Sequence, residues 1–152
     1  MDFHRSTFLI ALIGLSLMAQ HTWAGDLEHR VYLGLWSDHW YNDSPEYNES
    51  NQVVQYSLYN PVQYGKEAIT VATFINSHFD RTWALGYGQE YPVIFVPDIK
   101  FGWQVGVMYG YGDKLATNWN GISPTVQFHF KYDVLKVQIM GPAINVGLEG
   151  TF

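Results

Sequence analysis

The sequence predicts an all-β protein, an eight-stranded antiparallel transmembrane β-barrel of the bacterial outer membrane that is preceded by a cleaved signal peptide. Three observations lead to this fold class: an apolar leader, a shortage of charge, and alternation of apolar with polar residues along successive segments. Of the 152 residues, 47% are hydrophobic and only 14% are charged, against roughly 25% charged residues in a typical soluble domain. The chain is therefore short of the groups that solvate a surface.

The leader has the order of a secretory signal peptide. A short start containing Arg5 precedes an apolar run over residues 8–19, and Thr22-Trp23-Ala24 ends it as a small-x-small cleavage site. As a helix the apolar run would reach about 18 Å, well short of a bilayer core of about 30 Å. We therefore expect a signal peptide over residues 1–24 rather than a membrane anchor, and one barrel domain over residues 25–152.

Alternation with a period of two follows the leader. In residues 125–132 aromatic and aliphatic side chains alternate with Thr, Gln, His and Lys, and residues 101–111, 135–139 and 143–152 repeat the pattern. A soluble β-sandwich would need a second sheet to cover the apolar face. Strands with polar residues inside and apolar residues outside are what a transmembrane barrel requires, because lipid accepts no unpaired strand edge. The terminal Phe152 is common in outer-membrane barrels.

Eight strands are predicted in chain order, over residues 30–38, 52–60, 67–76, 82–91, 99–111, 121–132, 134–140 and 143–152. A barrel of eight strands has room for its own side chains or one slim ligand, which excludes a porin-like channel. With both termini periplasmic, the outer connections are 39–51, 77–81, 112–120 and 141–142, and the periplasmic ones are 61–66, 92–98 and 133. Aromatic residues near the strand ends are expected to form interfacial girdles: Tyr32, Trp36, Trp40, Tyr59, Tyr87, Tyr91, Trp103 and Tyr132.

Charge and cysteine content exclude several classes of function. The net charge of −6 and the lack of a basic block argue against a nucleic-acid partner. The absence of cysteine excludes disulfides, thiolate-bound metals and thiol catalysis. We expect no cofactor, no metal and a monomeric barrel.

Three polar clusters fall on the predicted outer side. They are Ser37-Asp38-His39 with Asp43, Glu46 and Glu49, then Asn76-Ser77-His78 with Asp80 and Arg81, and finally Asp113-Lys114. A serine beside a histidine, with an amide or carboxylate near, is the composition that acyl transfer needs. The same residue types also occur simply at strand ends, and the acidic residues could form a solvated loop or hold divalent cations beside lipopolysaccharide phosphates.

One stretch points to a known family. Residues 74–88 (FINSHFDRTWALGYG) resemble, without a gap, the third strand, loop and fourth strand of the lipid A palmitoyltransferases (PagP), where an F-x-D-S segment leads into a strand ending G-Y-G. Tyr47-Asn48-Glu49 is similar to the Y-N-E before their second strand. Met140-Gly141-Pro142 and residues 145–152 correspond to their proline-bearing loop and last strand. The N-terminal amphipathic helix common in the family has no counterpart.

This resemblance implies an activity and its residues. The family's catalytic Asp-Ser pair falls on Asn76 and Ser77, and the nearest counterpart of its catalytic histidine is His39, although alignment on the shared Trp would give Ser37. The implied enzyme moves a fatty acyl chain from phospholipid to lipid A in lipopolysaccharide, so these outer-membrane lipids are the expected partners. His39 would be the base, Ser77 the hydroxyl or positioning residue, and Asn76 an amide donor to the oxyanion.

The resemblance also implies a substrate site. Gly88 corresponds to the glycine that floors the acyl-chain pocket, and Pro124 and Pro142 resemble prolines that interrupt strand pairing and admit lipid sideways. Small residues on the inward faces would leave a slot: Ala84, Gly86, Gly88, Gly102, Gly106 and Gly110. Lys131, Lys136 and Glu149 point inward too, so we expect a polar plug in the periplasmic half and the slot in the outer half.

Two other functions remain open. The chain could be a non-enzymatic small outer-membrane barrel that masks a receptor or modulates adhesion, or a lipid A deacylase that uses the same serine and histidine.

Overall fold

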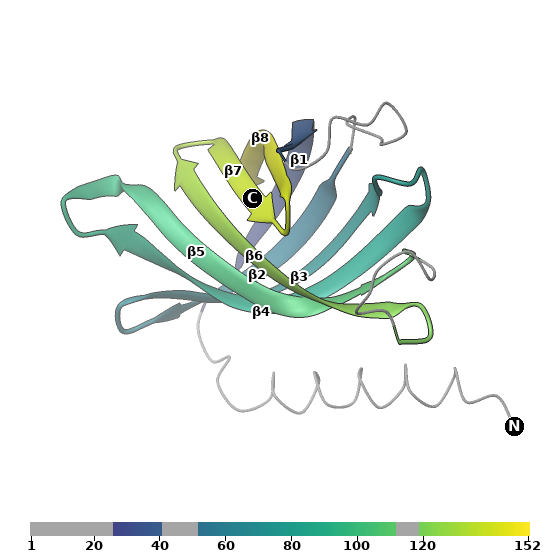
Figure 1. Ribbon diagram of the computed structural model, residues 1–152. Helices are drawn as coiled ribbons and strands as arrows, with labels where there is room; N and C mark the ends of the chain where they lie inside the picture. The colour runs from purple at the N-terminus through teal and green to yellow at the C-terminus, as the bar shows by residue number, and fades with distance from the viewer. Residues whose placement is uncertain (1–25, 41–51, 112–118) are drawn as a thin grey trace, which may run out of the picture.

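A computed structural model describes residues 26–40, 52–111 and 119–152. Eight strands occur there: β1 (Glu28–His39), β2 (Val54–Val62), β3 (Gly65–Ile75), β4 (Arg81–Val93), β5 (Val96–Tyr109), β6 (Ile122–Tyr132), β7 (Leu135–Met140) and β8 (Ala143–Thr151). Each strand pairs antiparallel with the next, and β8 pairs with β1, so the sheet closes into a barrel (Figure 1). The described ranges contain no helix with the length and hydrophobicity of a membrane span.

The predicted strand count and order are confirmed. Each predicted boundary lies within three residues of the observed one. The predicted signal peptide over residues 1–24 lies outside the described ranges, so its cleavage after Ala24 stays a prediction.

The two ends of the barrel differ in their connections. Two-residue turns join β2 to β3, β4 to β5 and β6 to β7, and they gather at the left of Figure 1, which we call the turn end. The connections predicted at 61–66 and 92–98 are thus shorter than expected, because Pro61 and Pro92 stay in register with Lys66 and Lys100. The turns after β3 and β7 lie at the opposite end of the barrel. We call it the cavity end, because a cavity lies in that half of the interior.

Alternation sets the two faces of the sheet as predicted. Val126, Phe128 and Phe130 of β6 are exposed, whereas the intervening Gln127 and His129 are buried inside the barrel. The same alternation holds in β5, β7 and β8. The barrel therefore carries its large apolar side chains outside and its polar side chains inside, the reverse of a soluble domain.

Two residues of the predicted aromatic girdles lie elsewhere. Tyr32 and Tyr59 are buried in the interior, so their placement at strand ends on the outer surface was wrong. The hydroxyl of Tyr32 donates to Asn145, and the guanidinium of Arg30 lies 3.8 Å from the ring centre of Tyr59. Both tyrosines take inward positions because a narrow barrel needs large side chains to fill it, and each has a polar partner there.

A charged layer fills the half of the interior toward the turn end. Arg30 Nη1 lies 3.0 Å from carboxylate oxygens of both Glu90 and Glu149. Glu149 also pairs with Lys131 and Lys136. Each of these side chains is at least nine-tenths buried, so together they occupy the interior where the sequence predicts a polar plug.

The half toward the cavity end has an apolar wall. Tyr32, Val53, Phe74 and Met108 form a buried cluster there, with Ala84 and Met140 packed against it. The interior thus changes from paired charges to apolar side chains along the barrel axis.

Candidate functional site

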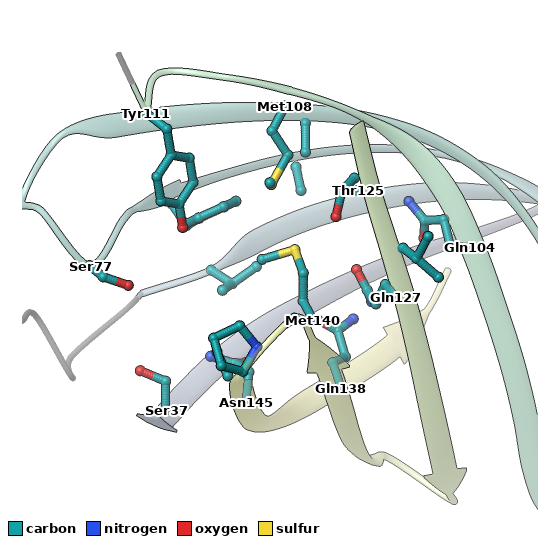
Figure 2. Close-up of a pocket in the computed structure, with 18 of the residues that line it drawn as sticks. Ser37, Ser77, Gln104, Met108, Tyr111, Thr125, Gln127, Gln138, Met140 and Asn145 are labelled. Atoms are coloured by element: carbon teal, nitrogen blue, oxygen red, sulfur yellow. The ribbon is translucent and has the colours of Figure 1, made fainter. Parts of the chain in front are cut away.

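A cavity of about 520 Å³ lies in the cavity-end half of the barrel (Figure 2). This volume is in the range of small-molecule sites, roughly 300–1,000 Å³. Its wall combines Val53, Ala72, Phe74, Ala84, Met108, Pro124, Met140 and Pro142 with polar side chains from six strands and the turns between them. A wall that combines apolar and polar side chains suits an amphiphilic ligand.

A serine and a histidine meet at this cavity. His39 is the last residue of β1, and Ser77 lies in the 76–80 turn that joins β3 to β4. His39 Nε2 lies 2.7 Å from Ser77 Oγ, and both residues also line the cavity. Their exposed fractions are only 9% and 7%, so the pair is shielded from bulk solvent. The strand order brings these two residues together, because β1 and β3 both flank β2.

Two backbone hydrogen bonds fix the end of β1 that carries His39. The backbone N–H of His39 donates to Asp38 Oδ1 at 2.8 Å. The next backbone N–H, that of Trp40, donates to the carbonyl of Pro142 at 3.3 Å. The end of β1 is thereby tied to the turn between β7 and β8.

Asn76 organises the turn that carries Ser77. Its Oδ1 accepts from the backbone N–H groups of His78 and Asp80, at 2.8 and 3.1 Å. Its Nδ2 donates to Thr82 Oγ1 at 3.0 Å and to the carbonyl of Gly110 at 3.1 Å. The side chain is fully buried and is not part of the cavity wall. Its amide therefore fixes the conformation of the turn and ties it to β4 and to the end of β5.

Tyr111 completes the polar group around Ser77, and sequence reasoning missed it. Its ring packs edge-on against His78 with centroids 6.2 Å apart, and it lines the cavity on the side of Ser77 (Figure 2). Burial raises the pKa of Tyr111, and a hydrogen bond with Ser77 partly offsets that shift. With 11 tyrosines in the chain, no pattern distinguishes this one.

The wall of the barrel is incompletely paired beside the cavity. β6 pairs with β5 from Ile122 onward, but with the short β7 only from Gln127. Pro124, which has no N–H to donate, lies in the part of β6 that has no β7 partner. Pro142 lies in the turn between β7 and β8. Val126 lines the cavity and is also 51% exposed on the outside. The cavity therefore reaches the outer surface between β6 and β7.

The predicted slot is occupied by side chains. A Cβ on Gly86 would lie 2.0 Å from Gln104 Nε2, and a Cβ on Gly102 would lie 2.2 Å from the ring of His129. Gly88 is paired with Gln104, and a Cβ there would meet the carbonyl of Trp103. Gly88 is not part of the cavity wall. The cavity therefore ends at the side-chain amide of Gln104, which lies over Gly86, one inward-facing position above the predicted floor at Gly88.

The structure brings some predicted site residues together and leaves others apart. His39, Ser77, Pro124 and Pro142 share the cavity, while Asn76 lies directly behind Ser77. The predicted acidic residues of the 39–51 connection and Asp113-Lys114 lie outside the described residues. Within the described residues, no three His, Asp or Glu side chains are grouped to hold a metal ion.

This arrangement has the parts that acyl transfer uses. A serine hydroxyl bonded to an imidazole is an activated nucleophile, and the adjacent apolar cavity would take an acyl chain. No protein-family model matches the chain, and no curated protein matches it either.

Proposed function

We propose that the chain is an outer-membrane enzyme that transfers a fatty acyl chain from phospholipid to lipid A, with Ser77 as nucleophile and His39 as base. The hydrogen bond between Ser77 Oγ and His39 Nε2, at the wall of an apolar cavity, is the observation that carries this function. The resemblance of residues 74–88 to lipid A palmitoyltransferases supports the same reaction.

A membrane location is part of the proposal. The outer face of the barrel carries exposed Val, Leu, Phe, Tyr and Trp side chains, while charges lie inside. This distribution matches a lipid-facing barrel. We infer that residues 1–24 direct the chain across the inner membrane and are removed, and that the cavity end faces outward.

The reaction would proceed in two steps. Ser77 Oγ attacks the ester carbonyl of a phospholipid as His39 Nε2 takes the hydroxyl proton; the ester C–O bond then breaks, and the leaving alcohol takes the proton from His39. A hydroxyl of lipid A next attacks the acyl-serine, losing its proton to His39, and Ser77 leaves with that proton. Tyr111 lies beside Ser77 and would donate to the developing oxyanion. Asn76 acts as a positioning residue that holds the turn.

The gap between β6 and β7 supports a lipid substrate. Val126 and Pro124 border the cavity on an outward-facing stretch without a β7 partner. A phospholipid chain could enter there from the membrane plane without crossing the charged layer. A water-soluble substrate would need no such side opening.

The test is the mass spectrum of lipid A from a Gram-negative host that expresses the full chain. Wild-type chain should be recovered in the outer-membrane fraction without residues 1–24, and lipid A should gain the mass of one acyl chain. The variants Ser77→Ala and His39→Phe should each lower the acylated fraction by about 100-fold or more, because each removes one half of the nucleophile–base pair.

Ser123→Ala is the matched control. Ser123 is equally buried but lies outside the cavity wall, and its hydroxyl has no partner among the described residues, so acylation should not change. Loss of acyl mass would identify a deacylase that uses the same pair. An unchanged lipid A in a host with the chain correctly folded in its outer membrane would reject both enzymes and favour a surface barrel that acts in adhesion or receptor masking.

A further inference from the structure

The floor of the cavity is built from glutamines. Gln55 of β2, Gln104 of β5, Gln127 of β6 and Gln138 of β7 all line it. Gln104 and Gln127 are direct partners in the β5–β6 ladder, and Gln138 is paired with His129 of the charged layer. Figure 2 shows Gln104, Gln127 and Gln138 on the opposite side of the cavity from Ser77. The apolar wall thus ends in a layer of amides.

A purely hydrocarbon ligand does not explain this layer. Apolar side chains at the floor would serve an acyl chain better, because burying an amide against hydrocarbon costs free energy when its hydrogen bonds are unmade. Two of the four glutamines are bonded to each other: Gln138 Nε2 donates to Gln55 Oε1 at 3.0 Å. Gln55 in turn donates to Ser57 at 3.1 Å.

Of the remaining two glutamines, Gln127 has an amide nitrogen that no described residue bonds. Gln127 is only 8% exposed, and its Nε2 has no hydrogen-bond partner among the described residues. Buried polar groups in native proteins are nearly always bonded, so this amide indicates a partner other than the described residues. Gln104 lies beside it, in the space that Gly86 leaves open, and contributes a second amide to the same part of the wall.

We propose that the cavity floor at Gln104 and Gln127 is a subsite for a hydroxyl group near the far end of a hydroxyacyl chain. A hydroxyl both donates and accepts, and so it matches the carbonyl and NH₂ of a glutamine amide. This inference rests on the proposed acyl transfer and specifies its substrate class. Tyr111, beside Ser77, is seven residues from Gln104, or about 18 Å along the axis for strands tilted by roughly 40°. The hydroxyl would therefore lie far from the ester carbonyl.

The experiment measures binding, so that its outcome is independent of acyl transfer. The full chain carrying Ser77→Ala, folded in detergent micelles, is loaded with a fluorescent fatty acid. Displacement is then compared for ω-hydroxy fatty acids and for unsubstituted acids of the same chain lengths. At one chain length the hydroxy acid should bind about tenfold more tightly or better, as expected for one well-formed hydrogen bond to a buried amide.

Two variants and one control complete the test. Gln127→Leu and Gln104→Leu should each reduce the preference for the hydroxy acid toward unity, and heat-modified migration on unboiled gels reports whether each barrel is folded. Gln63→Leu, at an exposed glutamine in a turn-end hairpin, should leave the preference unchanged. Equal binding of the two acids at every length, or a preference that survives in folded forms of both floor variants, would overturn the subsite. A preference without any change in lipid A would instead keep the subsite and reject the proposed transfer.

Discussion

Asn76 shows how one side-chain amide can fix the conformation of a turn. The carbonyl half accepts from two backbone N–H groups of the turn, and the NH₂ half donates to the Thr82 hydroxyl and the Gly110 carbonyl. Only an amide has this division of acceptor and donor. The aspartate implied by the family resemblance would accept from the turn equally well, but it would point a second oxygen at the carbonyl of Gly110.

We therefore expect Asn76→Asp to destabilise the protein rather than to raise its activity. A buried carboxylate would lose two donated hydrogen bonds and face a carbonyl oxygen, which should lower the free energy of unfolding by about 1–3 kcal/mol and lower the acylation rate. Urea unfolding in detergent and the lipid A spectrum measure the two effects. Asn120→Asp, at an exposed residue in the left-handed region, is the control and should change neither. A stable and more active Asn76→Asp protein would contradict this account of the turn.

At the scale of strands, the difference between β6 and β7 determines where the cavity opens. β7 has six residues and β6 has eleven, so the outer part of β6 has a neighbour on one side only. Val126 and its β5 partner Val105 both point outward and are similarly exposed, but only Val126 borders the cavity. This pair of valines allows the opening to be tested with a matched control.

Val126→Trp should narrow the opening and slow the entry of a phospholipid chain. We expect acyl transfer from phospholipid vesicles to fall by about tenfold, with little change in hydrolysis of a short soluble ester that can enter from the cavity end. Val105→Trp places the same side chain on the neighbouring strand, where it should have no effect on either substrate. If both substrates slow equally in Val126→Trp, the opening is not the route of lipid entry.

The strands themselves were predictable because their period of two is a local property of the sequence. Val126, Phe128 and Phe130 alternate with polar residues whatever the rest of the chain does, and barrel closure needs only the number of such segments. Turn lengths were less predictable, because Pro61 and Pro92 remain in register near the strand ends where prolines usually stop a ladder.

The site could be predicted only in part for the same reason. The resemblance to the lipid A palmitoyltransferases placed the expected site at Ser77 and His39, whose residue types at outer strand ends also suit acyl transfer. Tyr111 was missed because no pattern distinguishes it from the other tyrosines. Gln104 was missed because its role depends on which side chain fills the space above Gly86 of β4. Packing between strands determines which side chain fills that space, and the sequence of a single strand does not predict it.

For the molecule as a whole, the interior charges join strands that are distant in sequence. Arg30 on β1 is bonded to both Glu90 on β4 and Glu149 on β8, and Glu149 is also bonded to Lys131 on β6 and Lys136 on β7. Because most large apolar side chains lie on the outside, the interior is held by this charged layer, the small apolar cluster of the cavity end and the backbone ladder. The charged layer also separates the cavity from the turn end, as expected for a barrel that forms no channel for ions or solutes.

Glu149→Gln tests how much this layer contributes to stability. Glu149 is the shared partner of Arg30, Lys131 and Lys136, and its removal leaves three buried cations with fewer anionic partners. Breaking a buried ion pair in this way typically costs about 3–5 kcal/mol, so the urea midpoint in detergent should fall sharply. Asp133→Asn makes the same change of charge in the exposed turn between β6 and β7, where side-chain charges contribute little, and should leave the midpoint unchanged. Equal midpoints for the two variants would show that the backbone ladder alone holds the barrel closed.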